Sequence, residues 1–174
     1  MGQLAFDEAR AAAFAVHAHG DQLYGVSLYS AHLEEVRKVL LDFGFGGAIA
    51  QAAWLHDTIE DTGHTRKTIA DAFGDDVAAL VWAVTGVGVN RKARVADAYA
   101  KIVAHPEAVF LKLADRIANV ESSARTRYDA DRLAMYRKEQ PAFEAMIVRA
   151  KMADHGLVVR MLERLQSALR GKAE

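Results

Sequence analysis

The sequence predicts an all-helical fold in a single domain, and three observations lead to this prediction. The chain has 174 residues, which is an ordinary length for one domain. It contains 34 alanines and only two prolines, and alanine favours helices most strongly whereas proline disfavours them. Apolar residues recur at helical spacing along most of the chain, and no segment shows the strict alternation typical of a strand. Because no repeat or linker interrupts the chain, we expect one domain over residues 1–174.

The first half of the chain predicts a series of short helices that end at glycines. The first presents Leu4 and Val16 on one apolar face and is expected to stop at Gly20, because glycine often ends a helix. A later one, over residues 48–57, is too apolar to face water, so we expect it to be central and buried. A polar segment at residues 61–64 then interrupts the helical pattern. The helices expected in this half cover residues 4–16, 30–43, 48–57, 65–73 and 77–84.

The second half begins with a loop at residues 86–90, where two glycines alternate with valines. Pro141 is expected to separate two of the helices that follow, because proline is favoured in the first helical turn, where its missing N–H would have no partner. The helices expected in this half cover residues 92–104, 107–124, 129–139, 141–154 and 157–169.

The composition excludes several kinds of partner and site. Lysine and arginine number 22 against 23 aspartates and glutamates, so the net charge is −1 and we expect no nucleic-acid or membrane partner. The chain has no cysteine, which excludes disulfides and thiol nucleophiles and leaves histidines and carboxylates to hold any transition metal. No apolar segment has the length of a membrane helix, and residues 1–20 lack a signal-peptide pattern. We therefore expect a cytoplasmic protein, whose oligomeric state the sequence does not reveal.

Two pairs of polar residues, His56-Asp57 and Glu60-Asp61, follow the apolar segment that begins at residue 48. Burying carboxylates costs several kcal/mol unless they are paired, so acidic residues beside a buried helix need an explanation. If the helical path continues, Glu60 lies one turn beyond His56 and Asp61 one turn beyond Asp57, and both pairs then lie near one face. The residues could together hold a cation, or Asp57 and Asp61 could simply cap neighbouring helices.

Two further segments place polar residues where apolar ones are expected. Asp115 interrupts an apolar helical face, and Asn119 and Ser122 follow it on the same stripe. The alternative, a surface patch of Asp115 with Arg116, is weak because adjacent residues on a helix do not face each other. His32 lies at the start of the second helix, where a histidine is more often a cap or a packed core residue than a ligand. Two histidines and two aspartates from three helices could nevertheless form a nitrogen and oxygen site of the kind that suits Mn, Fe or Zn.

The order of these residues resembles the H…HD…D signature of the HD-domain metal-dependent phosphohydrolases. Longer motifs narrow the resemblance, because LHDTIEDT at residues 55–62 and KLADR at residues 112–116 are similar to the hydrolase domain of the RelA/SpoT family. The similarity covers about residues 5–150 in unbroken order, and the remaining helices extend to about residue 170. The resemblance implies an HD-domain helical bundle. Since the chain stops where longer members continue into a synthetase domain, it looks like a stand-alone small alarmone hydrolase.

This resemblance implies a substrate, a metal and a catalytic pair. The substrate would be guanosine 3′,5′-bis(diphosphate) or its pentaphosphate relative, together (p)ppGpp, which would lose its 3′-pyrophosphate. One divalent ion, normally Mn²⁺ with Fe, Co or Zn as alternatives, would polarise the phosphate and lower the pKa of the attacking water. Glu60 and Asp61 would orient that water or accept its proton. The metal ligands would be His32, His56, Asp57 and Asp115.

The resemblance also implies residues that bind the rest of the nucleotide. The basic residues at 91–94 open a helix after the glycine loop, where backbone N–H groups add further anion donors. Lys92 is the first choice for a phosphate contact and Arg91 the second, with a solvated basic patch as the alternative. Arg132 and Tyr136 match a further pair near the phosphates. The positions that match the nucleoside pocket are Asn119 and Ser122.

One loop departs from the family pattern. Many alarmone hydrolases carry an Arg-Lys pair before the Tyr-x-x-His motif, and the arginine packs on guanine, whereas residues 23–29 contain no cation here. Tyr24 could stack on a purine instead, and stacking tolerates any base. The alternatives to (p)ppGpp hydrolysis are an HD phosphohydrolase of another nucleotide (an adenine alarmone or a 2′-phosphorylated dinucleotide) and a non-catalytic alarmone-binding module. The intact Glu60-Asp61 pair argues against the binding module, because a sensor needs no water-activating residues.

Overall fold

The computed structural model describes residues 2–125 and 129–171 and confirms the all-helical prediction. Within these residues every helix is too short or too polar to span a membrane. Two very short strands form a hairpin between the first two helices. The helices are α1 (Gly2–His19), α2 (Tyr29–Asp42), α3 (Ala48–Leu55), α4 (Thr58–Asp61), α5 (Arg66–Phe73), α6 (Asp75–Val84), α7 (Arg91–Ala104), α8 (Ala108–Arg125), α9 (Ala130–Arg149) and α10 (Gly156–Arg170).

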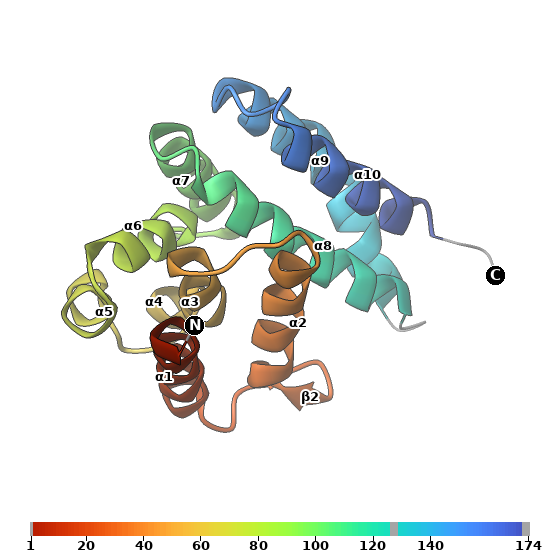
Figure 1. Cartoon of the computed structure of the whole chain (residues 1–174). Helices are drawn as coiled ribbons and strands as arrows, with labels where there is room; N and C mark the ends of the chain where they lie inside the picture. Colours follow the sequence, from red (N-terminus) through yellow and green to blue (C-terminus); the bar gives the residue numbers. More distant parts are fainter. Residues whose placement is uncertain (1, 126–128, 172–174) are drawn as a thin grey trace.

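Helix α8 lies at the centre of the fold. It packs against α2, α3 and α6 on one side and against α9 and α10 on the other (Figure 1). Its apolar residues Leu111, Leu113, Ile117 and Val120 are completely buried, and each large aliphatic side chain contributes about 1.5–3 kcal/mol when it is buried. Because α8 is covered on both sides, its polar residue Asp115 is also buried and needs charged or hydrogen-bonding partners.

Helix α3 confirms the prediction of a central, buried helix after residue 47. Ala50, Ala52, Ala53 and Leu55 are completely buried, and the helix packs against α1, α2 and α6. Small alanine side chains permit this close approach of several helices at once. The chain leaves α3 after Leu55 and turns directly into α4, so the residues between the two helices are held inside the protein.

Helix α9 corrects the prediction that Pro141 begins a separate helix. The chain is one continuous helix from residue 130 to residue 149, and Pro141 lies inside it with its side chain exposed. A proline in a helix interior costs about 3 kcal/mol. Tyr136, Phe143 and Met146 are buried on both sides of the proline, and their packing offsets that cost.

The hairpin formed by β1 (Leu23–Tyr24) and β2 (Ser27–Leu28) is the second difference from the sequence prediction. Each strand has two residues, which is too short to produce a recognisable alternation. Gly25 permits the turn, because it adopts a φ of 64°, where residues with a Cβ are strained. The hairpin matters for the site because it carries Tyr24 over the start of α2.

Candidate metal centre and cavity

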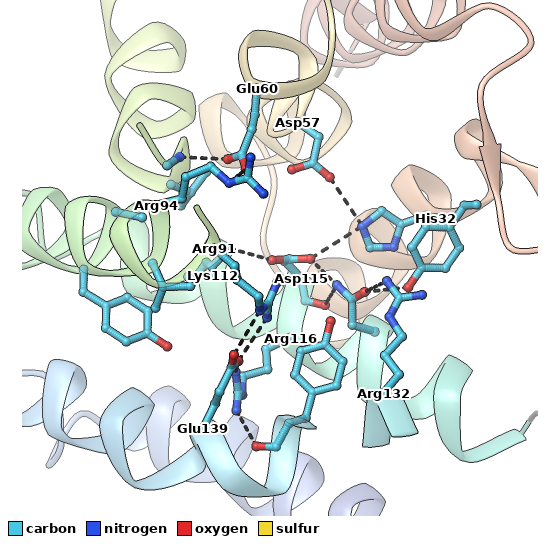
Figure 2. A pocket seen from close by; sticks show the side chains of 18 of the residues that line it. His32, Asp57, Glu60, Arg91, Arg94, Lys112, Asp115, Arg116, Arg132 and Glu139 are labelled. Carbon is cyan, nitrogen blue, oxygen red and sulfur yellow. Dashed lines mark hydrogen bonds and ion pairs between the residues drawn. The ribbon is translucent and has the colours of Figure 1, made fainter. Parts of the chain in front are cut away.

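His32 lies in the first turn of α2 and points into the protein. The residue is 2% exposed, and its Nε2 lies 3.7 Å from Asp57 Oδ2 and 3.5 Å from Asp115 Oδ1. It does not cap α2, because the N-terminus of that helix has no side-chain cap hydrogen bond. The histidine instead faces two carboxylates from other parts of the chain (Figure 2).

His56 and Asp57 occupy the turn between α3 and α4. His56 is 1% exposed, and its Nδ1 donates a hydrogen bond of 2.8 Å to the carbonyl of Ala53. When the ring is neutral, this bond keeps the proton on Nδ1 and leaves the Nε2 lone pair directed away from the helix, as is usual for a metal-binding histidine. That Nε2 lies 3.0 Å from Asp57 Oδ2 and 3.7 Å from Asp115 Oδ1.

Electrostatics keep this cluster ionised. Burial raises the pKa of both Asp57 and Asp115, but neighbouring positive charges outweigh burial and hold both pKa values below their usual range. His56 has this effect on Asp57, and Lys112 has the largest one on Asp115. Burial lowers the pKa of His56, and the two aspartates reverse this and raise it to about 10. The cluster therefore requires positive charge close to its two carboxylates.

The donor atoms fit a divalent metal. His32, His56 and Asp57 each offer one ligand atom, and these atoms lie within 4.8 Å of one another. The contact between His56 Nε2 and Asp57 does not have hydrogen-bond geometry, so this buried nitrogen has no hydrogen-bond partner among the described residues. A lone pair that faces two carboxylates is favourable only when a cation lies between them. Asp115 adds a fourth donor atom, an oxygen that lies 3.5 Å from His32 Nε2 and 3.7 Å from His56 Nε2.

Neighbouring side chains hold both carboxylates in place. The hydroxyl of Tyr29 donates to Asp57 Oδ2 at 2.6 Å. Lys112 Nζ donates to Asp115 Oδ2 at 2.8 Å, and Asn119 Nδ2 donates to Asp115 Oδ1. Such outer contacts orient metal-binding carboxylates and are part of the site.

Glu60 and Asp61 have different surroundings, although the sequence predicts both beside the metal. Glu60 Oε2 accepts a hydrogen bond of 2.8 Å from the Gly86 backbone N–H, and its side chain lines the cavity next to the metal cluster. Asp61 is exposed, lies outside the cavity lining and accepts a hydrogen bond of 3.3 Å from Gln22. The structure therefore places one of the two carboxylates where it can meet a bound ligand.

Three residues of the cluster, His32, Asp57 and Asp115, line a cavity of about 190 Å³. Arginine and lysine contribute five side chains to its wall and carboxylates contribute four, so basic residues predominate even before a metal adds two charges. Figure 2 shows these charged groups converging on the cavity from several helices. The lining residues are Tyr24, Tyr29, His32, Asp57, Glu60, Val84, Gly86, Arg91, Arg94, Val95, Ala98, Tyr99, Lys112, Asp115, Arg116, Asn119, Arg132, Tyr136 and Glu139.

The basic segment at the start of α7 contributes two arginines to the wall, but not the lysine that the sequence favoured. Arg91 and Arg94 line the cavity, whereas Lys92 is exposed outside it. Helical geometry explains the difference, because residues 91, 94, 95 and 98 share one face and residue 92 lies about 100° away from residue 91. Arg91 forms two hydrogen bonds of 3.0 Å with Glu139 of α9.

Helix α8 contributes a second stripe at the same spacing. Lys112, Asp115, Arg116 and Asn119 all line the cavity, whereas Ser122 does not. Arg116 is buried and donates to the Tyr136 carbonyl at 2.7 Å and to Gln140 Oε1 at 3.2 Å. Four charged lining residues were not among the predicted site residues, and helical spacing from the predicted ones would have found them. They are Arg94, Lys112, Arg116 and Glu139.

Tyr24, which the sequence analysis considered as a residue that could stack on a purine, lines the cavity and contacts two of its other residues. Its ring stacks on His32 with 4.6 Å between centroids, and the Arg132 guanidinium lies 4.5 Å from its centroid. Both groups therefore pack against the ring. The Tyr24 hydroxyl and Arg132 Nη2 both donate to Asn119 Oδ1, at 2.5 and 3.0 Å. Tyr24 therefore connects His32 to the wall that Arg132 forms.

Comparison with known proteins agrees with this geometry. A family model described as an HD domain matches residues 9–144. The chain belongs to the HD-domain family. The guanosine-3′,5′-bis(diphosphate) 3′-pyrophosphohydrolase of Aquifex aeolicus (strain VF5) is 37% identical to this HD domain over 119 residues, which are 65% of the chain and 17% of that relative. The GTP pyrophosphokinase rsh of Brucella ovis is 30% identical over 154 residues, which are 83% of the chain and 20% of that relative.

A solved structure has the same fold. It is described as a metazoan ortholog of SpoT that hydrolyzes ppGpp, and it superposes on this HD domain with a TM-score of 0.71, 20% identity and 96% coverage of each chain. The chain spans a fifth or less of the length of the two curated relatives. HD-domain membership, together with the donors of His32, His56 and Asp57, identifies a site for a divalent metal.

Proposed function

We propose that this HD domain is a metal-dependent hydrolase that removes the 3′-pyrophosphate from (p)ppGpp-type nucleotides. One observation carries the proposal: a cluster of two histidines and two aspartates contributes to the wall of a cavity that is rich in arginine and lysine. Such a cavity suits a polyanion with its reacting phosphate beside a cation. The similarity to the Aquifex aeolicus enzyme supports the same class of substrate.

In the proposed reaction, the oxygen of a water molecule bonds to the phosphorus attached to the ribose O3′, and the P–O3′ bond breaks. The water loses a proton and O3′ gains one, so the products are pyrophosphate and a nucleotide with a free 3′-hydroxyl. When bound, the divalent metal supplies Lewis acidity at the phosphate and lowers the pKa of water. We assign Mn²⁺ to His32, His56, Asp57 and Asp115, because this nitrogen and oxygen donor set suits it, with Fe, Co or Zn as alternatives.

We assign proton transfer and phosphate binding to other residues according to their positions around the cavity. Glu60 is the base that takes the proton of the water, because its carboxylate lies on the cavity wall and Gly86 fixes its orientation. Asp61 accepts a hydrogen bond from Gln22 outside the cavity lining, so we assign the proton transfer to Glu60 alone. Arg91, Arg94 and Arg132 supply the positive charge for the remaining phosphates.

A second group of substrates, the corresponding adenine nucleotides, is favoured by the surroundings of Tyr24. Since His32 stacks on this ring and the guanidinium of Arg132 lies 4.5 Å from its centroid, we place the base against Arg132 rather than against the tyrosine. A guanidinium plane stacks on either purine. We therefore expect recognition to depend mainly on the phosphates and the ribose.

The test is a turnover assay of ppGpp, pppGpp and adenosine 3′,5′-bis(diphosphate) with the purified protein and added Mn²⁺. We expect release of pyrophosphate, and its loss when EDTA removes the metal. Release of single phosphates would reject the assigned bond cleavage. Tight binding of the nucleotides without turnover would reject the hydrolase and indicate an alarmone-binding module instead.

A further inference from the structure

Lys112 lies between the metal cluster and the rest of the cavity. Its Nζ donates to Asp115 Oδ2 at 2.8 Å, while the other oxygen of the same carboxylate lies 3.5 Å from His32 Nε2. One carboxylate group therefore separates the ammonium from a candidate metal ligand. The side chain is 26% exposed, and it belongs to the lining of the cavity (Figure 2).

Two other basic side chains of the cavity wall are held by protein acceptors away from the metal cluster. Arg91 is held by Glu139, and Arg116 by the Tyr136 carbonyl and Gln140. By contrast, the ammonium of Lys112 has three N–H donors, and Asp115 is its one acceptor among the described residues. Two donors of a fixed positive charge thus remain for a ligand beside the metal cluster.

We propose that Lys112 binds a phosphoryl oxygen of the 3′-pyrophosphate next to the metal and stabilises the charge that develops there during hydrolysis. The inference rests on the proposed function and adds a substrate contact to it. One oxygen of Asp115 faces His32 and the other pairs with Lys112. A phosphate bound next to the metal ligands His32 and Asp115 therefore lies close to the ammonium of Lys112. Positive groups aimed at a phosphoryl oxygen act most strongly where water is excluded.

A purely structural role for Lys112, as the partner that holds Asp115, makes a different prediction. In that case loss of the lysine would disturb Asp115 and reduce metal affinity before it affects any ligand. The chain offers a matched control in Lys101 of α7. Lys101 Nζ lies 2.7 Å from Asp97 one helical turn away, its side chain is 18% exposed, and it lies outside the cavity lining.

The experiment compares Lys112→Gln, Lys112→Arg and Lys101→Gln with the unmodified protein. Calorimetry measures Mn²⁺ binding to the metal-free protein and then the binding of inorganic pyrophosphate to the Mn²⁺-loaded protein, and turnover of ppGpp is followed separately. We expect Lys112→Gln to keep its Mn²⁺ affinity within about threefold, to bind pyrophosphate at least about tenfold more weakly and to lose at least about a hundredfold in kcat. Lys112→Arg should recover part of both losses, and Lys101→Gln should change neither.

Two results would overturn the inference. One is a pyrophosphate affinity and kcat of Lys112→Gln equal to those of Lys101→Gln. The other is a parallel loss of Mn²⁺ and pyrophosphate binding in both Lys112 variants, which would show that the lysine acts only by holding Asp115. If the unmodified protein binds pyrophosphate through Lys112 but does not cleave ppGpp, the proposed substrate is wrong while the phosphate contact of Lys112 is retained.

Discussion

Replacing Glu60 with glutamine separates the chemical step from metal and substrate binding. The amide oxygen of glutamine can still accept the 2.8 Å hydrogen bond from Gly86, so the local structure is preserved. The 3.5 Å contact with Arg94 joins two partly exposed side chains and contributes about 0–1 kcal/mol. We therefore expect little change in stability. Turnover should fall by roughly 10²–10⁴, the usual contribution of a general base, which corresponds to about 3–5 kcal/mol in the activation barrier.

Asp61→Asn provides the matched control, since it removes the same charge from the adjacent residue outside the cavity lining. Pyrophosphate release under saturating substrate measures kcat, and calorimetry measures Mn²⁺ affinity in both variants. We expect kcat of Asp61→Asn to fall less than about tenfold. A Glu60→Gln enzyme with unchanged kcat, or an Asp61→Asn enzyme that loses as much, would refute the assignment of Glu60 as the base.

Three further predictions concern the metal, the glycine loop and the base. His56→Ala or Asp115→Ala should abolish both Mn²⁺ retention and turnover, whereas His155→Ala, a change at the N-cap of α10, should retain both; metal analysis and activity assays measure this. Gly86→Ala would place a Cβ 2.7 Å from a backbone oxygen of the neighbouring helix, so we expect thermal or urea unfolding to show a loss of about 1–3 kcal/mol in stability. We also expect a lower kcat, because relief of this clash shifts the backbone N–H that donates to Glu60. The kcat/KM values for guanine and adenine 3′-pyrophosphates should agree within about tenfold, and a guanine preference above about a hundredfold would contradict recognition through phosphates and ribose.

Local sequence signals were sufficient to predict most helices, because their apolar spacing and glycine ends agree with the fold. Helix α3 is an example, since a segment that is apolar on every face can only be buried. The turn after it was informative for the same reason, because His56 and Asp57 cannot be buried there without charged partners. The continuous helix through Pro141 could not be predicted, since the packing of Phe143 and Met146 outweighs the local preference of proline.

The missing parts of the site depend on contacts between distant segments. Arg91 and Glu139 are separated by 48 residues, and the spacing within either helix does not show that they meet. Tyr24 could be chosen from its loop, but its contacts with His32 and Arg132 depend on a hairpin too short to predict. Lys92 lies outside the cavity lining for a local reason, because the helical phase of residue 91 directs residues 94 and 95 to the same wall.

Three helices contribute side chains to the cavity wall at the same helical spacing. Residues on α7, α8 and α9 line it at spacings of three, four and seven, so each helix contributes one stripe of side chains. On α8 this stripe is polar although the helix is buried on both sides, and an unpaired Asp115 or Arg116 would cost several kcal/mol there. Lys112 and the Tyr136 carbonyl remove that cost by pairing with them. The same pairs that make the polar stripe stable in the core therefore fix the charges around the metal cluster, so that stability and the arrangement of the site depend on the same contacts.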